Sequence, residues 1–280
     1  MPQDPPAPKR LPGLVAAFAH TTQAVVDLAH ACTDDDLARP TDCPGWTVHD
    51  QISHVVGVEA WLAGRKDPRV EMPHYDHVKN DLAKRVEYAV EVRRGRTGAD
   101  VVAELEDVLA QRIATLSGPG MTDASIIAGP FGPAELATVL VLRTFDVWTH
   151  EQDIRSALGR PGNLDSPAAA VFVSSVMQQL PKLVARGAGV EPGQTVFVDV
   201  TGPVEAHLGV RVELDRESRP RGHVVASDSS PDGQATTITL SAEAFTRRAA
   251  GRRPVSDTEY SVIGDAAIAR RVMESLVVTH

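Results

Sequence analysis

Cysteine, aromatic residues and long apolar runs are scarce in this chain of 280 residues, and each scarcity excludes a class of protein. The two cysteines, Cys32 and Cys43, are too few for a disulfide framework at this length. Aromatic residues make up 4% of the chain, so its core has to be built mainly from Ala, Val and Leu, which suit closely packed helices. No uncharged apolar run reaches about 18 residues, so no membrane span is predicted.

An excess of basic residues is also missing. The chain has 28 Lys and Arg against 37 Asp and Glu, a formal net charge of −9. A surface that binds nucleic acid regardless of sequence needs a basic face, and anionic lipid attracts basic segments, so neither partner is expected. Residues 1–10 are rich in proline and lack an apolar segment after a basic start, which predicts a disordered tail rather than a secretory signal. We therefore expect a cytoplasmic protein.

The first half of the chain has the apolar spacing of helices. Helices are predicted over residues 12–31, 48–63, 77–93 and 99–116, and from Pro133 to about Leu158. Thr47 followed by Asp50 is the capping-box pattern for the helix that begins at Val48. This half is expected to form a helical bundle.

The second half changes from helical to alternating periodicity after one more predicted helix at 167–187. Strands are predicted over residues 195–201, 207–214, 235–240 and 260–263, and helices over 242–249 and 265–276. The expected fold class is α+β, with a helical bundle followed by a smaller domain of antiparallel sheet and helices. The predicted domains are a tail at 1–10, a bundle at 11–160 and an α+β domain at 161–280.

Asp146 and His150 form the pair of residues that most directly suggests chemistry. They are four residues apart on a predicted helix, so both side chains project from one face. His54, near the buried stripe of another predicted helix, is the candidate third ligand. Three protein ligands with an open position are typical of a catalytic zinc, although two imidazoles and one carboxylate also suit iron, nickel or manganese. By spacing alone, the same residues could also be ordinary polar positions on helices.

Other charged residues near this stretch are expected to be solvated. Glu151 and Asp153 should face solvent or pair with Arg155. The arginine pairs are predicted on solvated faces, where one of them could bind a substrate carboxylate: Arg93-Arg94, Arg247-Arg248, Arg252-Arg253 and Arg270-Arg271. No G-x-S-x-G motif occurs, and no Gly-rich phosphate loop opens a helix after a strand.

Two motifs carry a family resemblance. The stretch from Cys43 to His54 resembles the CPGW-x-V-x-D-x-x-x-H signature of mycothiol-dependent maleylpyruvate isomerase-like proteins. The segment 143–155 is similar to that family's second metal motif. Gly264-Asp265-Ala266 with the helix that follows resembles the sterol-carrier-like domain often appended to the family.

The resemblance implies a DinB-like four-helix bundle that holds a divalent metal, usually zinc, through His54, Asp146 and His150. It also implies mycothiol as a thiol cofactor, whose thiolate attacks a small electrophilic substrate in an isomerase or transferase reaction like that of maleylpyruvate. The expected partners are the thiol and the substrate, and the expected assembly is a monomer or homodimer. The family commonly has Glu where this chain has Asp146, a side chain one methylene shorter.

Two other functions remain open at this stage. One is a non-catalytic protein that binds metal or a small molecule, or has a regulatory role, and keeps the fold. The other is a hydrolase that uses metal-activated water, since the same open position can generate hydroxide near neutral pH. The motifs identify neither the electrophile nor the arginine that would bind its carboxylates.

Overall fold

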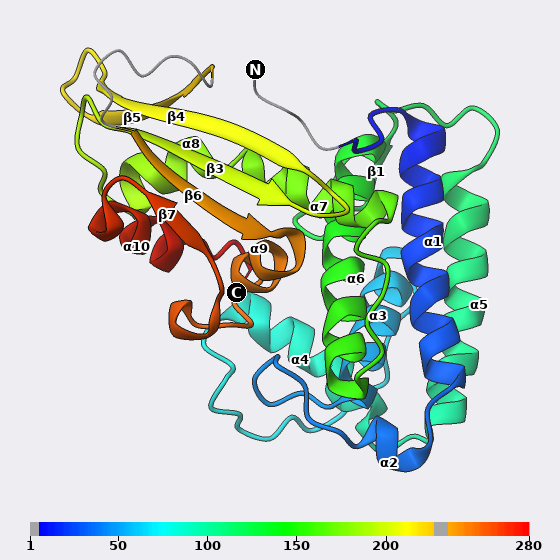
Figure 1. Ribbon diagram of the computed structural model, residues 1–280. Helices are drawn as coiled ribbons and strands as arrows, with labels where there is room; N and C mark the ends of the chain where they lie inside the picture. The colour runs from blue at the N-terminus through cyan, green and yellow to red at the C-terminus, as the bar shows by residue number, and fades with distance from the viewer. Residues whose placement is uncertain (1–5, 227–234, 280) are drawn as a thin grey trace. The chain divides into compact units, whose positions relative to one another are not determined.

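The computed structural model describes residues 6–226 and 235–279, which divide into two compact units, one of Pro8–Gly162 and one built on Asn163–His280 (Figure 1). The first is helical and the second carries a five-stranded sheet, so the predicted α+β class is confirmed. Of the tail expected at 1–10, residues 1–5 lie outside the description, and residues 6–9 have no regular secondary structure.

The first unit contains a ring of four helices. Its helices are α1 (Leu11–His30), α2 (Asp34–Leu37), α3 (Val48–Leu62), α4 (Asp81–Arg94), α5 (Gly98–Leu116) and α6 (Leu136–Leu158). Helices α1 and α3 each pack against both α5 and α6, and α4 packs on the outside of α3 (Figure 1). Apolar side chains such as Phe18, Ile52, Leu105 and Leu140 fill the interior of the ring. Facing helices around one core are the arrangement in which bundle proteins place their sites.

Helix ends in this unit follow from local side-chain bonds. Thr47 caps α3 as predicted, because its hydroxyl accepts from Asp50 N (3.3 Å) while the Asp50 carboxylate accepts from Thr47 N (3.0 Å). Helix α4 begins at Asp81 rather than near residue 77, because Asn80 supplies the cap. Helix α6 begins at Leu136 rather than Pro133, because the two preceding residues form a short strand.

That strand belongs to a small hairpin that the sequence did not predict. Strand β2 (Ala134–Glu135) pairs with β1 (Ile126–Ile127) in antiparallel orientation. Each strand has only two residues, too few for an alternating pattern to be visible in the sequence. The hairpin therefore delays the start of α6 by three residues.

The second unit begins with helices and continues with the sheet. Its elements are α7 (Pro167–Met177), α8 (Leu180–Lys182), a π-helical turn (Leu183–Gly187), β3 (Thr195–Thr201), β4 (Ala206–Leu214), β5 (Pro220–Val225), β6 (Ala235–Ser241), α9 (Ala242–Ala249), a 3₁₀ turn (Val255–Asp257), β7 (Ser261–Ile263) and α10 (Ala266–Ser275). The strand order is β5-β4-β3-β6-β7.

The expectation of an antiparallel sheet is wrong for its central pair. Strands β3 and β6 run parallel, with Thr195 opposite Ala235 and Thr201 opposite Ser241, whereas the other neighbours are antiparallel. An alternating pattern fixes which side chains face the core and carries no information on strand direction. The sheet is therefore mixed.

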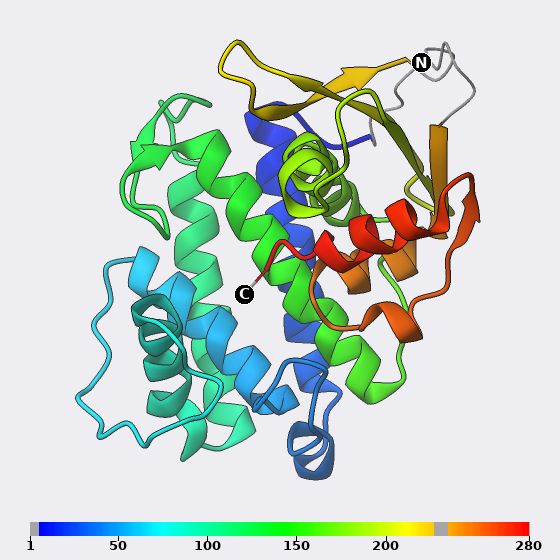
Figure 2. The same cartoon turned by 90° about the vertical axis from the view of Figure 1, so that its left-hand side faces the viewer.

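One face of this sheet is apolar and buried. Val196, Val198, Val210, Ile238 and Leu240 lie at alternate positions of β3, β4 and β6, and the positions between them are mostly polar or glycine, with Phe197 as an apolar exception. Helices α7 to α10 contact the strands on this side (Figure 2). The stretch 167–187 is long and apolar enough to cross a membrane by length and composition alone. In the 18-residue window of this stretch that meets those criteria, 61% of the residues are buried, as expected for a helix in a protein core.

A buried carboxylate joins three helices of the first unit. Glu59 on α3 is fully buried. Its Oε2 accepts from Arg112 Nε on α5 (2.8 Å), and its Oε1 accepts from Arg143 Nε on α6 (2.7 Å). A charge removed from water is tolerated only when opposite charges and hydrogen bonds replace the solvent. The two guanidinium groups do this for Glu59 and fix the three helices relative to one another.

We predict that Glu59→Gln destabilises the protein strongly, because the substitution leaves two buried guanidinium groups without their shared anion. The expected loss in free energy of unfolding is about 3–5 kcal/mol, measured by urea denaturation. Glu106→Gln is the matched control, since that carboxylate is half exposed and pairs with His30 at 2.9 Å. It should change stability by less than about 1 kcal/mol. Equal effects of the two substitutions would show that the Glu59 network does not hold the bundle.

Candidate metal centre

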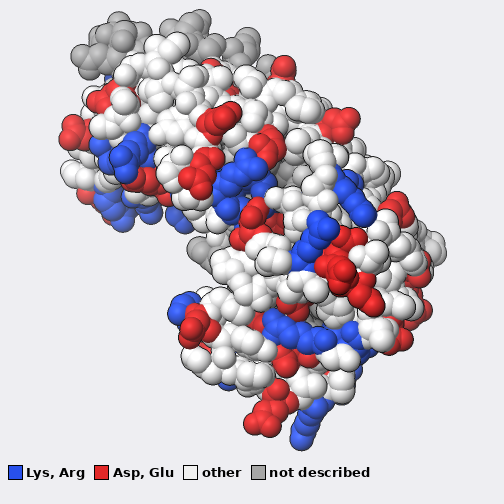
Figure 3. All heavy atoms as spheres, turned by 60° about the horizontal axis from the view of Figure 1, so that its bottom comes forward, with Lys and Arg blue, Asp and Glu red and all other residues white. Residues whose placement is uncertain are grey.

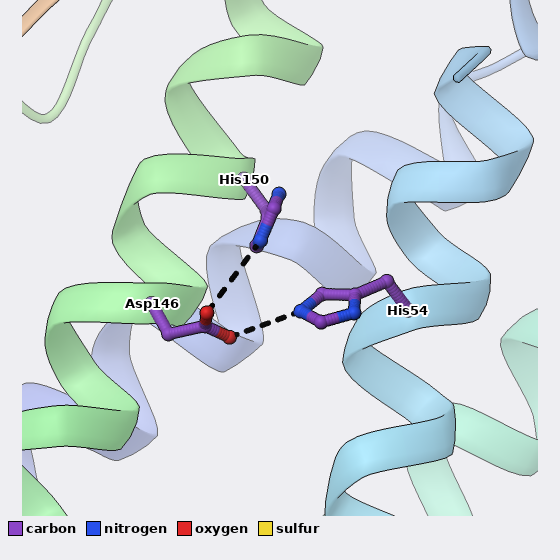
Figure 4. Close-up of side chains that lie close together, drawn as sticks. All are labelled: His54, Asp146 and His150. Carbon is purple, nitrogen blue, oxygen red and sulfur yellow. Dashed lines mark hydrogen bonds and ion pairs between the residues drawn. The ribbon is translucent and has the colours of Figure 1, made fainter. Parts of the chain in front are cut away.

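The structure brings the three predicted ligands together. His54 projects from α3, and Asp146 and His150 project toward it from successive turns of α6 (Figure 4). His54 Nε2 lies 3.1 Å from Asp146 Oδ2, and His150 Nε2 lies 3.7 Å from Asp146 Oδ1. One ligand atom from each residue lies within 4.8 Å of the others. The fold therefore places His54 beside Asp146 and His150, whereas the sequence identified it only as a candidate ligand.

The spacing of these atoms fits a divalent ion. Zinc binds imidazole nitrogen at about 2.0–2.1 Å, which in a tetrahedral site puts neighbouring donors about 3.4 Å apart. His54 Nε2 lies 3.1 Å from Asp146 Oδ2 and His150 Nε2 lies 3.7 Å from Asp146 Oδ1, so each imidazole is near this separation from one oxygen of the carboxylate. Asp146, although shorter than the glutamate common in the family, reaches both imidazoles. The donor set of two imidazoles and one carboxylate also suits such an ion.

The three side chains differ in exposure. The imidazoles of His54 and His150 are 5% and 8% exposed, whereas the Asp146 side chain is 33% exposed. The two nitrogen donors are therefore nearly dry, while the carboxylate retains contact with solvent. A low-dielectric environment strengthens the electrostatic interactions among these groups.

The surroundings shift the pKa values of the two histidines in opposite directions. Burial, helped by the nearby His150, lowers the pKa of His54 to about 4. Burial also opposes a charge on His150, but the carboxylates of Asp146 and Asp153 outweigh it and raise the pKa of that imidazole. The pKa of Asp146 lies well below its usual range, because Arg143 and the two histidines outweigh its burial. At neutral pH the cluster therefore contains a carboxylate and a neutral His54.

Trp46, Gln51 and Arg143 contact the cluster and were not predicted as site residues. The ring centroid of Trp46 lies 5.1 Å from that of His54 and 5.8 Å from that of His150, so the buried indole forms one wall. Gln51 Oε1 lies 2.5 Å from His150 Nδ1. Arg143 donates from Nη1 to Asp146 Oδ2 at 2.8 Å.

Helical spacing offered a signal for two of these neighbours. Gln51 precedes His54 by three residues, and Arg143 precedes Asp146 by three, which places each neighbour on the same helix face as a ligand. Trp46 stands inside the first motif, but it lies before the helix begins, so periodicity does not orient it. Its position depends on a hydrogen bond from Nε1 to Glu87 Oε2 (2.8 Å) on α4.

The expectation that Glu151 and Asp153 face solvent is wrong. Both are fully buried, because α6 packs between α1 and α3 and has little solvent-facing surface at this level. Glu151 does pair with Arg155 (2.7 Å), the other expected outcome, and also accepts from Thr21 on α1 (2.7 Å). Asp153 Oδ2 lies 3.7 Å from His150 Nδ1, so this carboxylate is part of the surroundings of the cluster.

The expectation of solvated arginine pairs is also wrong for several members. Arg93, Arg247 and Arg248 are buried. Arg93 pairs with Asp67 (3.0 Å) and Glu104 (2.6 Å). Arg248 donates to the backbone carbonyls of Met273, Arg253 and Glu274. A guanidinium group has five donors, so it can satisfy several acceptors in the interior, which a charge count in the sequence does not reveal.

We predict that metal-free protein loses stability between pH 6.5 and 4 because of His54. The unfolded chain takes up a proton on this imidazole near pH 6.5, whereas the folded chain resists it down to about 4. The unfolded state therefore binds more protons in this window, and acidification should cost at most about 3 kcal/mol from this group. Urea denaturation at several pH values should show a shallower loss for His54→Gln than for the natural protein. Equal slopes would rule out His54 as the cause.

Comparison with known proteins places the helical unit in a family. Residues 18–155 match the family model described as the mycothiol maleylpyruvate isomerase N-terminal domain. Two proteins of Mycobacterium tuberculosis strains, both called uncharacterized, are 28% identical to the chain over 139 residues. The alignment covers 48% of this chain and 62% of each relative, so the chain spans about three fifths of the length of the curated relatives it matches.

Solved structures extend the likeness to the second unit. The crystal structure of the mycothiol-dependent maleylpyruvate isomerase has a TM-score of 0.53 and 16% identity, covering 90% of this chain and 92% of that one. A histidine-to-alanine mutant of the same enzyme gives a TM-score of 0.52 and 15% identity over the same shares. At these identities the likeness shows the fold alone. The family that the comparisons match to residues 18–155, just under half of the chain, is therefore the mycothiol maleylpyruvate isomerase N-terminal domain family.

Proposed function

We propose that this chain is a metal-dependent isomerase or transferase that uses mycothiol to act on a small electrophile, as in maleylpyruvate isomerisation. The observation that carries the proposal is the convergence of His54, Asp146 and His150 within 4.8 Å. All three lie in the segment that matches the family model. The shared fold of the maleylpyruvate isomerase structures gives further support.

The proposed ligands of a divalent ion, zinc in our proposal, are His54, Asp146 and His150. Such an ion supplies one piece of chemistry: it lowers the pKa of a coordinated thiol, so that a thiolate nucleophile exists near neutral pH. Asp146 contributes a negative charge and the two imidazoles contribute nitrogen donors. Three protein ligands leave a position for a small molecule, as catalytic zinc sites do.

Residues around the ligands hold them in place and exclude water. Arg143 donates to Asp146 Oδ2 and thereby fixes the orientation of the carboxylate. Its own pKa is raised, because the carboxylates of Asp146 and Glu59 outweigh the cost of burial, so it stays charged. The Trp46 indole covers the imidazoles and keeps that side of the cluster dry.

The remaining parts of the proposal concern the setting of the site. We assign residues 11–160 as the DinB-like metal-binding bundle and 161–280 as a sterol-carrier-like domain in a cytoplasmic monomer or homodimer. Small molecules, the thiol and the substrate, are the proposed partners. The net charge of −9 supports this choice over nucleic acid or anionic lipid. On the face drawn in Figure 3, Lys and Arg side chains lie interspersed with Asp and Glu.

We predict that purified protein binds zinc stoichiometrically, as measured by elemental analysis after dialysis. His54→Ala and His150→Ala should each lose the ion, because two donors hold a divalent metal poorly. His30→Ala is the matched control, since this exposed histidine lies on α1 and pairs with Glu106 instead. Absence of metal from the natural protein, or its retention in both ligand variants, would contradict the proposed site.

We also predict that mycothiol stabilises the zinc-loaded protein and supports turnover of maleylpyruvate. A ligand at 100 times its dissociation constant adds about 2.7 kcal/mol to the stability of the state that binds it. Thermal unfolding should show this gain in the natural protein and not in His150→Ala. Stabilisation without turnover of any electrophile would favour a binding or regulatory protein. Hydrolytic activity that needs no thiol would favour metal-activated water.

A further inference from the structure

Gln51 on α3 connects the candidate metal centre to the segment that precedes this helix. It is fully buried. Its Oε1 lies 2.5 Å from His150 Nδ1, and its Nε2 donates to Thr41 Oγ1 at 2.8 Å. Thr41 in turn lies 2.9 Å from the backbone carbonyl of Trp46. A chain of hydrogen bonds therefore runs from a ligand imidazole to a backbone acceptor.

The direction of every proton in this chain follows from its last member. A backbone carbonyl can only accept, and Trp46 O accepts from both the backbone N–H and the hydroxyl of Thr41, each at 2.9 Å, which uses the single hydroxyl proton. The hydroxyl oxygen is then left as an acceptor, which requires the NH₂ group of Gln51 to face it. Because the two ends of an amide have the same shape, this requirement is what orients Gln51. Its carbonyl oxygen must face His150.

The orientation of the Gln51 amide determines the tautomer of His150. An amide oxygen can only accept, so Nδ1 of His150 must carry a proton, whether the ring is neutral or charged. Only Nε2, which lies 3.7 Å from Asp146 Oδ1, remains available as a donor to a metal. We propose that Gln51 is a positioning residue that fixes the Nδ1–H tautomer of His150 and so reserves its Nε2 for the ligand cluster.

Asp153 is the competing acceptor for the same proton. Its Oδ2 lies 3.7 Å from His150 Nδ1, against 2.5 Å for Gln51 Oε1, so the amide is the closer partner. A carboxylate bonded to a ligand histidine increases the basicity of the imidazole. The neutral amide of Gln51 fixes the tautomer without adding a negative charge as the hydrogen-bond partner of the ring. The effect of this choice on a bound metal ion rests on the proposed function.

The test uses metal-free, full-length protein and the ¹⁵N chemical shifts of the His150 ring, recorded at a pH where the ring is neutral. The natural protein should show a protonated Nδ1 and a bare Nε2. Gln51→Glu keeps the length and an acceptor oxygen, so it should keep this tautomer. Gln51→Leu removes the acceptor and should populate the Nε2–H form, which can donate to Asp146. A protonated Nε2 on neutral His150 in the natural protein would overturn the proposal, even if Gln51→Leu fails to fold.

Zinc affinity, measured by competition with a chelator, gives the second readout. Gln51→Leu should bind zinc about 10–100-fold more weakly than the natural protein, and Gln51→Glu should bind at least as tightly. Asp153→Asn is the control, and it should leave the His150 tautomer unchanged. If Asp153→Asn shifts the tautomer and Gln51→Leu does not, Asp153 is the positioning residue and our assignment is wrong. If the natural protein binds no zinc, the proposed function fails while the tautomer measurement still decides the role of Gln51.

Discussion

The helical unit depends on the burial of one carboxylate between two guanidinium groups. Glu59 cannot stay in the interior unless Arg112 and Arg143 both reach it, and this requirement fixes the spacing of α3, α5 and α6. The Nη1 group of the same Arg143 side chain pairs with Asp146. The candidate metal centre therefore lies at the end of a charge network that begins in the core. Any change in packing that displaces α6 moves the ligand carboxylate with it.

The two histidines of the candidate metal centre have different electrostatic surroundings. Both rings are buried and both face Asp146, yet the pKa of His54 falls while that of His150 rises. Asp153 lies near His150, and its carboxylate adds to the effect of Asp146. Neighbouring groups whose pKa values are shifted in opposite directions are common at functional sites. Here the lowered pKa keeps the His54 imidazole neutral near neutral pH. The raised pKa favours a proton on His150, which a bound cation would displace.

Much of the fold could be predicted because its signals are local. Strand β3 and helix α9 begin and end where the sequence placed them, since alternation defines the strand and Ser241 caps the helix through a bond to Ala244 N (3.1 Å). Strand β5 was missed because its buried and exposed positions do not follow apolar and polar residues. Asp146 and His150 were paired from helical spacing, whereas the contacts of Glu59 join residues 53 and 84 positions away and depend on how the helices pack.

The cap at Thr47 has a consequence for how this protein can vary in length. It fixes the residue at which α3 begins, and Gln51 and His54 reach the cluster at set distances along the helix from that point. Each residue turns an α-helix by about 100°, so one residue inserted between Thr47 and Gln51 would rotate both side chains away from α6. A change of side chain in this segment alters one contact, but a change in residue number removes a ligand. The segment therefore tolerates substitution far better than insertion or deletion.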